Sequence, residues 1–157
     1  MLLDVGMKAP KFSVPNYNGE VVSLADFAGK KIVLWFFPKA STPGWTTQGC
    51  GLRDDYQKFS DNGIEVIGVS ADPQIKQQRF VEKYGFPFRM LCDESHEMLE
   101  AYGVWQLKKF MGREYMGIVR ASYLIDTEGT IEHVFDKVAV KTHSADVLDI
   151  TSKAYLK

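Results

Sequence analysis

The sequence contains only two cysteines, Cys50 and Cys92, only three histidines and no long apolar run. Two cysteines are too few for a disulfide scaffold, and neither a C-x-x-C pair nor a Cys/His cluster with zinc-ligand spacing is present. The longest apolar run, "IVLWFF", has six residues, whereas a membrane-spanning helix needs about 20. These absences argue against a disulfide-rich protein, a metal site and a membrane span, and we expect no cofactor.

Basic and acidic residues are also nearly equal in number. Lys plus Arg number 19 and Asp plus Glu number 20, so the net charge is −1. This balance gives no electrostatic reason to expect nucleic acid or an anionic membrane as a partner.

The opening "MLLDVGMKAPKF" has an early Asp4 and no basic region, unlike a signal peptide, and predicts a cytoplasmic protein. The histidines, His96, His133 and His143, are scattered, which favours structural or surface roles.

The 157 residues show no repeat, low-complexity tract or linker, and we expect one domain spanning 1–157. An Asn18-Gly19 turn predicts an N-terminal hairpin, followed by a short helical turn. The nearly continuous apolar runs 31–37 and 64–70 are typical of strands covered on both faces. A short strand is predicted at 88–93, and a second hairpin pairs 121–126 with 130–135.

Helical patterns lie between these strands. The first covers 46–61, with Leu52, Tyr56 and Phe59 facing the core and Asn62-Gly63 as its stop. The second begins at Asp72-Pro73, with Asp72 as cap and Pro73 in the first helical position, and ends at Gly85. Its core face comprises Phe80, Val81 and Tyr84, and that of a short helix over 95–103 comprises Met98 and Leu99. Residues 104–119 are interpreted as loop with patches of strand, and 144–157 as a closing helix.

This order predicts an α/β fold, a thioredoxin-like sandwich whose central mixed sheet is flanked by helices and extended by an N-terminal hairpin. Because no long exposed apolar strand demands a partner, a monomer is favoured. Trp35 and Trp105 are expected in the core or a pocket wall, and Cys92 as a small buried apolar residue.

The stretch "PKASTPGWTTQGC", residues 38–50, links the strand 31–37 to the helix that follows. Open α/β sheets place ligands and chemistry at the carboxyl ends of strands. Helix N-termini present unpaired N–H groups that stabilise a thiolate or a peroxide oxygen. By spacing alone, a catalytic loop and an ordinary connecting loop are equally acceptable interpretations.

A family resemblance favours the catalytic interpretation. The chain resembles a peroxiredoxin of the bacterioferritin comigratory protein class, also called peroxiredoxin Q, along essentially its whole length. The similarity runs through "APKFSVPNYNGE", "GIEVIGVSAD", "FMGREYMGIVRASYLID" and "GTIEHVF". Pro38 and Thr42 match the peroxiredoxin pattern P-x-x-x-T-x-x-C, but Trp45 stands in the place of its cysteine.

The resemblance implies a role for each matching residue. Position 45 would hold the peroxidatic cysteine, whose thiolate attacks the peroxide and becomes a sulfenic acid. Thr42 would hydrogen-bond the peroxide, Arg120 would stabilise the thiolate and the developing oxygen charge, and Pro38 would shield the pocket. Cys50 would be the resolving cysteine, forming a disulfide after local unwinding of the helix. The implied partners are a peroxide substrate and a thioredoxin-type reductant.

Trp45 changes this chemistry, because an indole has one N–H donor and no ionisable nucleophile. Its ring either fills the pocket between Thr42 and Arg120 or swings out and unwinds the start of the helix. Cys50 lies about 140° around the helix from position 45, so it would face away from the site and react slowly. We therefore predict that this chain has negligible peroxidase activity.

Two explanations of Trp45 stay open. One is a recent or engineered change in an intact peroxidase, and the other is a natural non-catalytic relative with a binding or chaperone role. Cys50 has little use without its partner, which favours the first. Arg53, inside the same helix, either supports the loop or pairs with Gln57 or an acidic neighbour.

Overall fold

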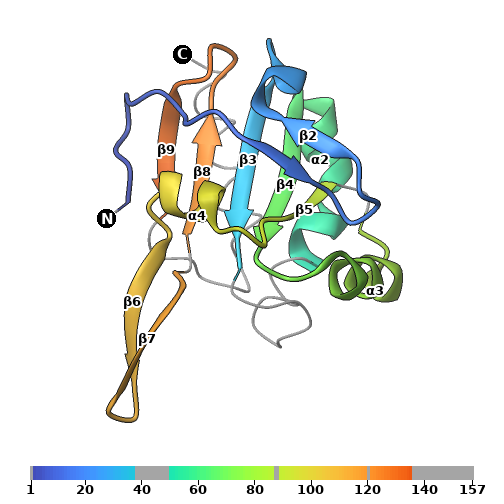
Figure 1. Cartoon of the computed structure of the whole chain (residues 1–157). Coiled ribbons are helices and arrows are strands. Elements are labelled where there is room, and N and C mark those ends of the chain that lie inside the picture. Colours follow the sequence, from blue (N-terminus) through green and yellow to red (C-terminus); the bar gives the residue numbers. More distant parts are fainter. Residues whose placement is uncertain (1, 38–49, 87–88, 120, 136–157) are drawn as a thin grey trace.

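A computed structural model of the chain describes residues 2–37, 50–86, 89–119 and 121–135. At its centre is a five-stranded mixed sheet with the order β5-β4-β3-β8-β9 (Figure 1). Its strands are β3 (Lys31–Phe36), β4 (Ile64–Ser70), β5 (Arg89–Cys92), β8 (Ala121–Ile125) and β9 (Ile131–Phe135). The two apolar runs and the second hairpin of the sequence are thus confirmed as strands.

The central strand β3 pairs in parallel with β4 and antiparallel with β8. Every residue of β3 after Lys31 is buried, as the continuous apolar run predicts. Alternate side chains point to opposite faces of a strand. Ile32, Leu34 and Phe36 accordingly belong to one apolar cluster, whereas Val33 and Trp35 belong to the other.

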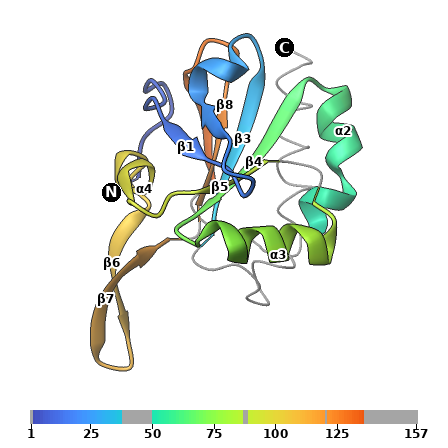
Figure 2. The same cartoon turned by 45° about the vertical axis from the view of Figure 1, so that its right-hand side comes forward.

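The two faces of the sheet are covered by different elements (Figure 2). One face carries α2 (Tyr56–Asp61) and α3 (Gln74–Tyr84), and the other carries α4 (Glu97–Ala101) together with the N-terminal hairpin. The predicted core residues of these helices are buried, Tyr56 and Tyr84 only in part. The closing helix predicted over 144–157 lies outside the described residues.

The N-terminal hairpin joins β1 (Ser13–Pro15) to β2 (Val21–Ser23), and the short 3₁₀ helix η1 (Leu24–Phe27) follows, as predicted. The carboxamide oxygen of Asn16 accepts hydrogen bonds from the N–H groups of Asn18 and Glu20, at 2.9 and 3.0 Å. This side chain fixes the turn, because an Asn oxygen can replace a backbone acceptor.

The start of α3 differs from the prediction. Pro73 is the N-cap, with extended backbone, and Gln74 is the first helical residue. Asp72 lies one residue before the N-cap, and its Oδ2 accepts a hydrogen bond from the Ser70 hydroxyl at 2.8 Å in a buried site. A carboxylate is costly to bury unless hydrogen-bond donors contact it, and the Ser70 hydroxyl is such a donor. Gly85 closes the helix in the left-handed conformation, as predicted.

Residues 104–119, expected to be loop with patches of strand, form a regular hairpin of β6 (Trp105–Phe110) and β7 (Arg113–Ile118) that projects from the body (Figure 1). The patches of strand are confirmed, and the expectation of a mainly loop-like segment is wrong. Its turn is Met111-Gly112, with φ of 50° and 78°. Two positive φ angles match the turn type that suits right-twisted strands, which Asn-Gly usually supplies. The two strands also lack the alternation of apolar and polar residues that is typical of a half-buried hairpin. The sequence pattern therefore did not predict them as regular strands.

Gly68 on β4 makes room for the Trp35 ring. A Cβ atom at position 68 would lie 2.9 Å from Trp35 Cε2 and 2.6 Å from Met90 Sδ. Trp35 is fully buried and stacks on Phe37, with ring centroids 4.7 Å apart. A glycine in mid-strand is normally unfavourable, and here close packing of the indole explains it.

Gly68→Ala is therefore expected to lower the free energy of unfolding by about 1–3 kcal/mol through overpacking. Chemical denaturation followed by far-UV circular dichroism measures the change. In a Met90→Ala background the same substitution should cost less, because one of the two blocking atoms is gone. A Gly68→Ala protein as stable as the unchanged chain would contradict the packing argument.

Asp93 caps α4 from outside the helix. Its Oδ2 accepts a hydrogen bond from the Leu99 N–H at 2.9 Å, and its Oδ1 accepts one from the Ser95 hydroxyl at 3.3 Å. Burial raises the pKa of Asp93 above its ordinary value of 3.8, although both hydrogen bonds act in the opposite direction. The folded state therefore favours the protonated form, and the stability that protonation contributes is lost as pH rises through the folded pKa.

Asp93→Asn should flatten this part of the pH dependence, because the amide keeps an acceptor for Leu99 but cannot ionise. As pH rises above about 3.8, the urea midpoint of the variant should increase relative to that of the unchanged chain, because only the unchanged chain loses the contribution of protonated Asp93. Glu82→Gln, an exposed change on α3, is the matched control and should leave the slope unaltered. Parallel profiles for Asp93→Asn and the unchanged chain would refute this role.

Candidate active site

The candidate site begins where β3 ends. Phe36 pairs with Val69 of β4 and with Ala121 of β8. The next residue, Phe37, donates its N–H to the Val69 carbonyl at 3.1 Å, and both phenylalanines are fully buried. The chain thus enters the stretch 38–49 from a point held on both sides by neighbouring strands.

The pairing of β3 with β8 brings the neighbour of Arg120, another predicted site residue, to the same end of β3. Ala121, which faces Phe36, directly follows Arg120 in the sequence, and Phe36 lies two residues before Pro38. The described flanks of the two segments therefore lie side by side at the carboxyl end of β3. Pro38, Thr42, Trp45 and Arg120 themselves lie outside the described residues, and their roles stay predictions.

Cys50 is the first described residue after the loop and lies in helical chain over 50–54. Its thiol is free and half-buried, and it packs against the helix-side apolar cluster. The helix predicted over 46–61 is confirmed from Cys50 onward, with a turn at Asp55 before α2. Leu52 and Phe59, two of its predicted core residues, are fully buried and hold this helix against the sheet.

Arg53 fastens the same helix to α3. Its Nη1 donates to the Tyr84 carbonyl at 2.6 Å, while its Nε and Nη2 contact Asp54 Oδ1 at 3.0 and 2.9 Å. Of the two pairings left open by the sequence, the one with an acidic neighbour is confirmed, and Gln57 instead donates to Asp61. The alternative that Arg53 supports the loop 38–49 concerns residues outside the described ranges. The Tyr84 carbonyl belongs to the last turn of α3, where helices leave acceptors unsatisfied.

A buried polar cluster lies at the carboxyl ends of β4 and β5 and was missed by the sequence analysis. Gln77 donates from Nε2 to Ser70 Oγ and to the Leu91 carbonyl, both at 3.0 Å. Ser70 in turn donates to Asp72. This network fixes the start of α3 against the sheet edge next to the candidate site. The one sequence signal for this cluster is a polar residue, Gln77, on the side of the helix that faces the core.

Cys92 has the opposite environment to Cys50. It is 2% exposed at the end of β5, and burial raises the pKa of its thiol to about 12, with Glu94 and Asp72 acting in the same direction. Because the thiolate is the nucleophile, Cys92 stays unreactive near neutral pH. Its prediction as a small buried apolar residue is confirmed.

The described histidines make aromatic contacts. His96 stacks on Trp105 with ring centroids 4.1 Å apart, and His133 meets Phe135 edge to face at 4.4 Å. Across the described ranges, no group of three His, Cys, Asp or Glu side chains is placed to hold a metal ion. Within the same ranges, no helix has the length and apolar character needed to cross a membrane.

Sequence comparison identifies close relatives of the chain. The family model described as AhpC/TSA matches residues 5–134. Peroxiredoxin Bcp of Escherichia coli K12 is 48% identical over 147 residues, which cover 94% of each chain. Peroxiredoxin Bcp of Bacillus subtilis is 46% identical over 148 residues, with the same coverage.

Solved structures give the same result for the fold. Bacterioferritin comigratory protein of Xanthomonas campestris, studied for alkyl peroxide reduction, superposes with a TM-score of 0.90 at 30% identity, covering 98% of this chain and all of the other. A cysteine-to-serine mutant of PrxQ from Xylella fastidiosa gives a TM-score of 0.92 at 25% identity, covering 100% of this chain and 99% of the other.

The contrast between the two cysteines predicts the thiol chemistry of the native chain. Dithionitrobenzoate should label one thiol per chain under native conditions, and the second only after unfolding in denaturant. Cys50→Ser should remove the rapidly labelled thiol, whereas Cys92→Ser should leave it. Loss of the rapid phase in Cys92→Ser, with its retention in Cys50→Ser, would reverse the assignment.

Proposed function

The chain belongs to the AhpC/TSA family, as a peroxiredoxin of the Bcp/PrxQ class with the thioredoxin-like fold, and we propose that it has the scaffold of a thiol-dependent peroxidase. Hydrogen peroxide and organic hydroperoxides are the proposed substrates, and a thioredoxin-type protein is the proposed reductant. The main support is 48% identity to a peroxiredoxin along 94% of both chains.

In this scaffold a cysteine thiolate at position 45 attacks one peroxide oxygen. The O–O bond breaks, the sulfur becomes a sulfenic acid, and the other oxygen takes a proton and leaves as water or an alcohol. Thr42 hydrogen-bonds the peroxide, Arg120 stabilises the thiolate and the developing oxygen charge, and Pro38 shields the pocket. The register of Phe36 with Ala121 supports this grouping, because it joins the flanks of the loop and of Arg120.

The resolving step falls to Cys50. Its thiolate attacks the sulfenic acid, a disulfide forms and water leaves, after which the reductant reduces the disulfide. Five helical residues span about 7.5 Å along the axis, whereas disulfide-bonded Cα atoms lie about 4.4–6.8 Å apart. The helix predicted from residue 46 would therefore have to unwind locally, and the Arg53 bond to the Tyr84 carbonyl is one interaction that opposes extensive unwinding.

We further propose that the present chain does not complete this cycle, because Trp45 replaces the attacking sulfur. The indole carries no ionisable nucleophile. Cys50 is five residues beyond that position and packs against the helix-side cluster. The chain then has the supporting residues of a peroxidase without its nucleophile.

Restoring the sulfur tests the proposal. Peroxide consumption coupled to thioredoxin and its reductase should be at background for the present chain and about a thousandfold or more higher for Trp45→Cys, since loss of a nucleophile removes most of an enzyme's rate. Trp45→Ser is the matched control, because it removes the indole without supplying sulfur, and it should stay at background.

Two outcomes would contradict the proposal. Turnover of the present chain equal to that of Trp45→Cys would show that position 45 does not carry the reaction. Failure of a folded Trp45→Cys protein to react with any hydroperoxide would show that the supporting residues do not form a peroxidase site.

A further inference from the structure

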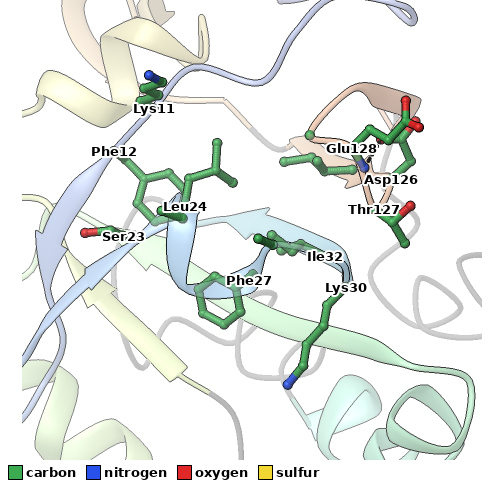
Figure 3. A pocket seen from close by; sticks show the side chains of 14 residues that line it. Lys11, Phe12, Ser23, Leu24, Phe27, Lys30, Ile32, Asp126, Thr127 and Glu128 are labelled. Carbon is green, nitrogen blue, oxygen red and sulfur yellow. Dashed lines mark hydrogen bonds between the residues drawn. The ribbon is translucent and has the colours of Figure 1, made fainter.

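A cavity of about 400 Å³ lies at the opposite end of the sheet from the candidate active site. It is bounded by the chain before β1, by η1, by the start of β3 and by the turn between β8 and β9 (Figure 3). Its floor includes Ile32 and Ile125, which face each other across β3 and β8. Ile32 precedes Phe36 by four residues, about 13 Å along the strand, so the cavity is separate from the peroxide site.

The walls of the cavity are apolar. Phe12, Phe27, Ile32 and Ile125 are all less than 10% exposed and belong to the same core cluster, and Leu24 packs against it. These side chains lie behind the cavity, and Leu24, Ala25 and Ala28 supply its more accessible apolar surface. Water is poorly held where few polar partners face it, so this floor suits the apolar body of a small molecule. The volume lies within the range of about 300–1,000 Å³ typical of ligand sites.

The rim of the cavity is charged, and the charges are separated. Lys11 stands on one side, whereas Asp126 and Glu128 stand on the other, on the β8–β9 turn (Figure 3). Asp126 is committed to the turn, because its Oδ1 accepts hydrogen bonds from the N–H groups of Glu128 and Thr130, both at 2.9 Å. An anionic group on a ligand is therefore directed away from this turn.

The two lysines at the rim differ in their surroundings. Lys30 lies 3.9 Å from a Glu65 carboxylate oxygen and extends away from the cavity walls (Figure 3). Lys11 is exposed and makes no ion pair with any described residue. It also lines a second, smaller cavity of about 160 Å³, together with Phe12 and Glu97. Within the described chain, Lys11 is thus the cation best placed to meet a bound anion.

We propose that this cavity is a binding site for a small molecule with a flat or short-chain apolar body and one anionic group, such as an aromatic sulfonate or carboxylate. The apolar body lies against Leu24 and Ala28, between η1 and the β8–β9 turn. The anionic group points to Lys11. The site is independent of the peroxidase function, and it would exist in the present chain and in Trp45→Cys alike.

Two probes that differ only in their head group test the two parts of the site. Naphthalene sulfonate and the uncharged naphthalene methanol are titrated into the full chain, and Kd is measured from protein chemical-shift changes in nuclear magnetic resonance. Both probes should shift signals from residues of η1 and the β8–β9 turn, with the sulfonate binding more tightly. Lys11→Gln should weaken sulfonate binding about fivefold, the range of an exposed ion pair, and leave methanol binding unchanged.

Variants that fill the cavity test its location. Ala28→Trp on one wall and Thr127→Trp on the other change exposed residues, so both should fold and both should weaken the two probes at least about tenfold by occupying the space. Ser60→Trp, an exposed change on α2 across the sheet, is the matched control and should bind both probes normally.

Three results would overturn the proposal. The first is that neither probe binds the chain. The second is binding that survives both filling variants, which would place the probes elsewhere. The third is equal affinity for the two probes with no effect of Lys11→Gln, which would leave an apolar hollow without selection for an anion.

Discussion

The pairing of β3 with β4 on one side and β8 on the other is the constraint on which the rest of the structure depends. It buries a strand completely, so that its alternate side chains build both apolar clusters at once. It also fixes, at opposite ends of one strand, the entry to the proposed peroxidatic loop and the floor of a separate cavity. A register slip of one residue would exchange the two faces and displace both sites.

Much of this architecture could be predicted because its signals are local. Continuous apolar runs identify β3 and β4, and Gly85 marks the end of α3. The β6–β7 hairpin could not be predicted in the same way. Its strands are largely exposed and carry lysines and glutamate, and its turn uses Met111, a residue that seldom adopts positive φ. The pairing of the two strands, rather than their composition, defines the element.

The candidate site likewise has parts that the sequence predicts and parts that it does not. The type and spacing of residues 38–50 identify the loop through a family resemblance, and the structure positions its described flanks and Cys50. Two features of the surroundings had no sequence signal. One partner of Arg53 is a backbone carbonyl, which any residue would offer. Asp72 accepts a hydrogen bond from the buried hydroxyl of Ser70, at the end of the preceding strand. Such contacts depend on which elements the fold brings together.

The different depths of the two cysteines have a consequence for how the chain behaves in air or under oxidants. Cys50 and Cys92 are the only cysteines of the sequence, and Cys92 is enclosed in the core, so a chain oxidised at Cys50 has no second accessible thiol of its own. Any disulfide formed by the native protein therefore joins it to another molecule, whether a small thiol or a second copy. Storage without reductant is therefore expected to give mixed disulfides or dimers joined through Cys50.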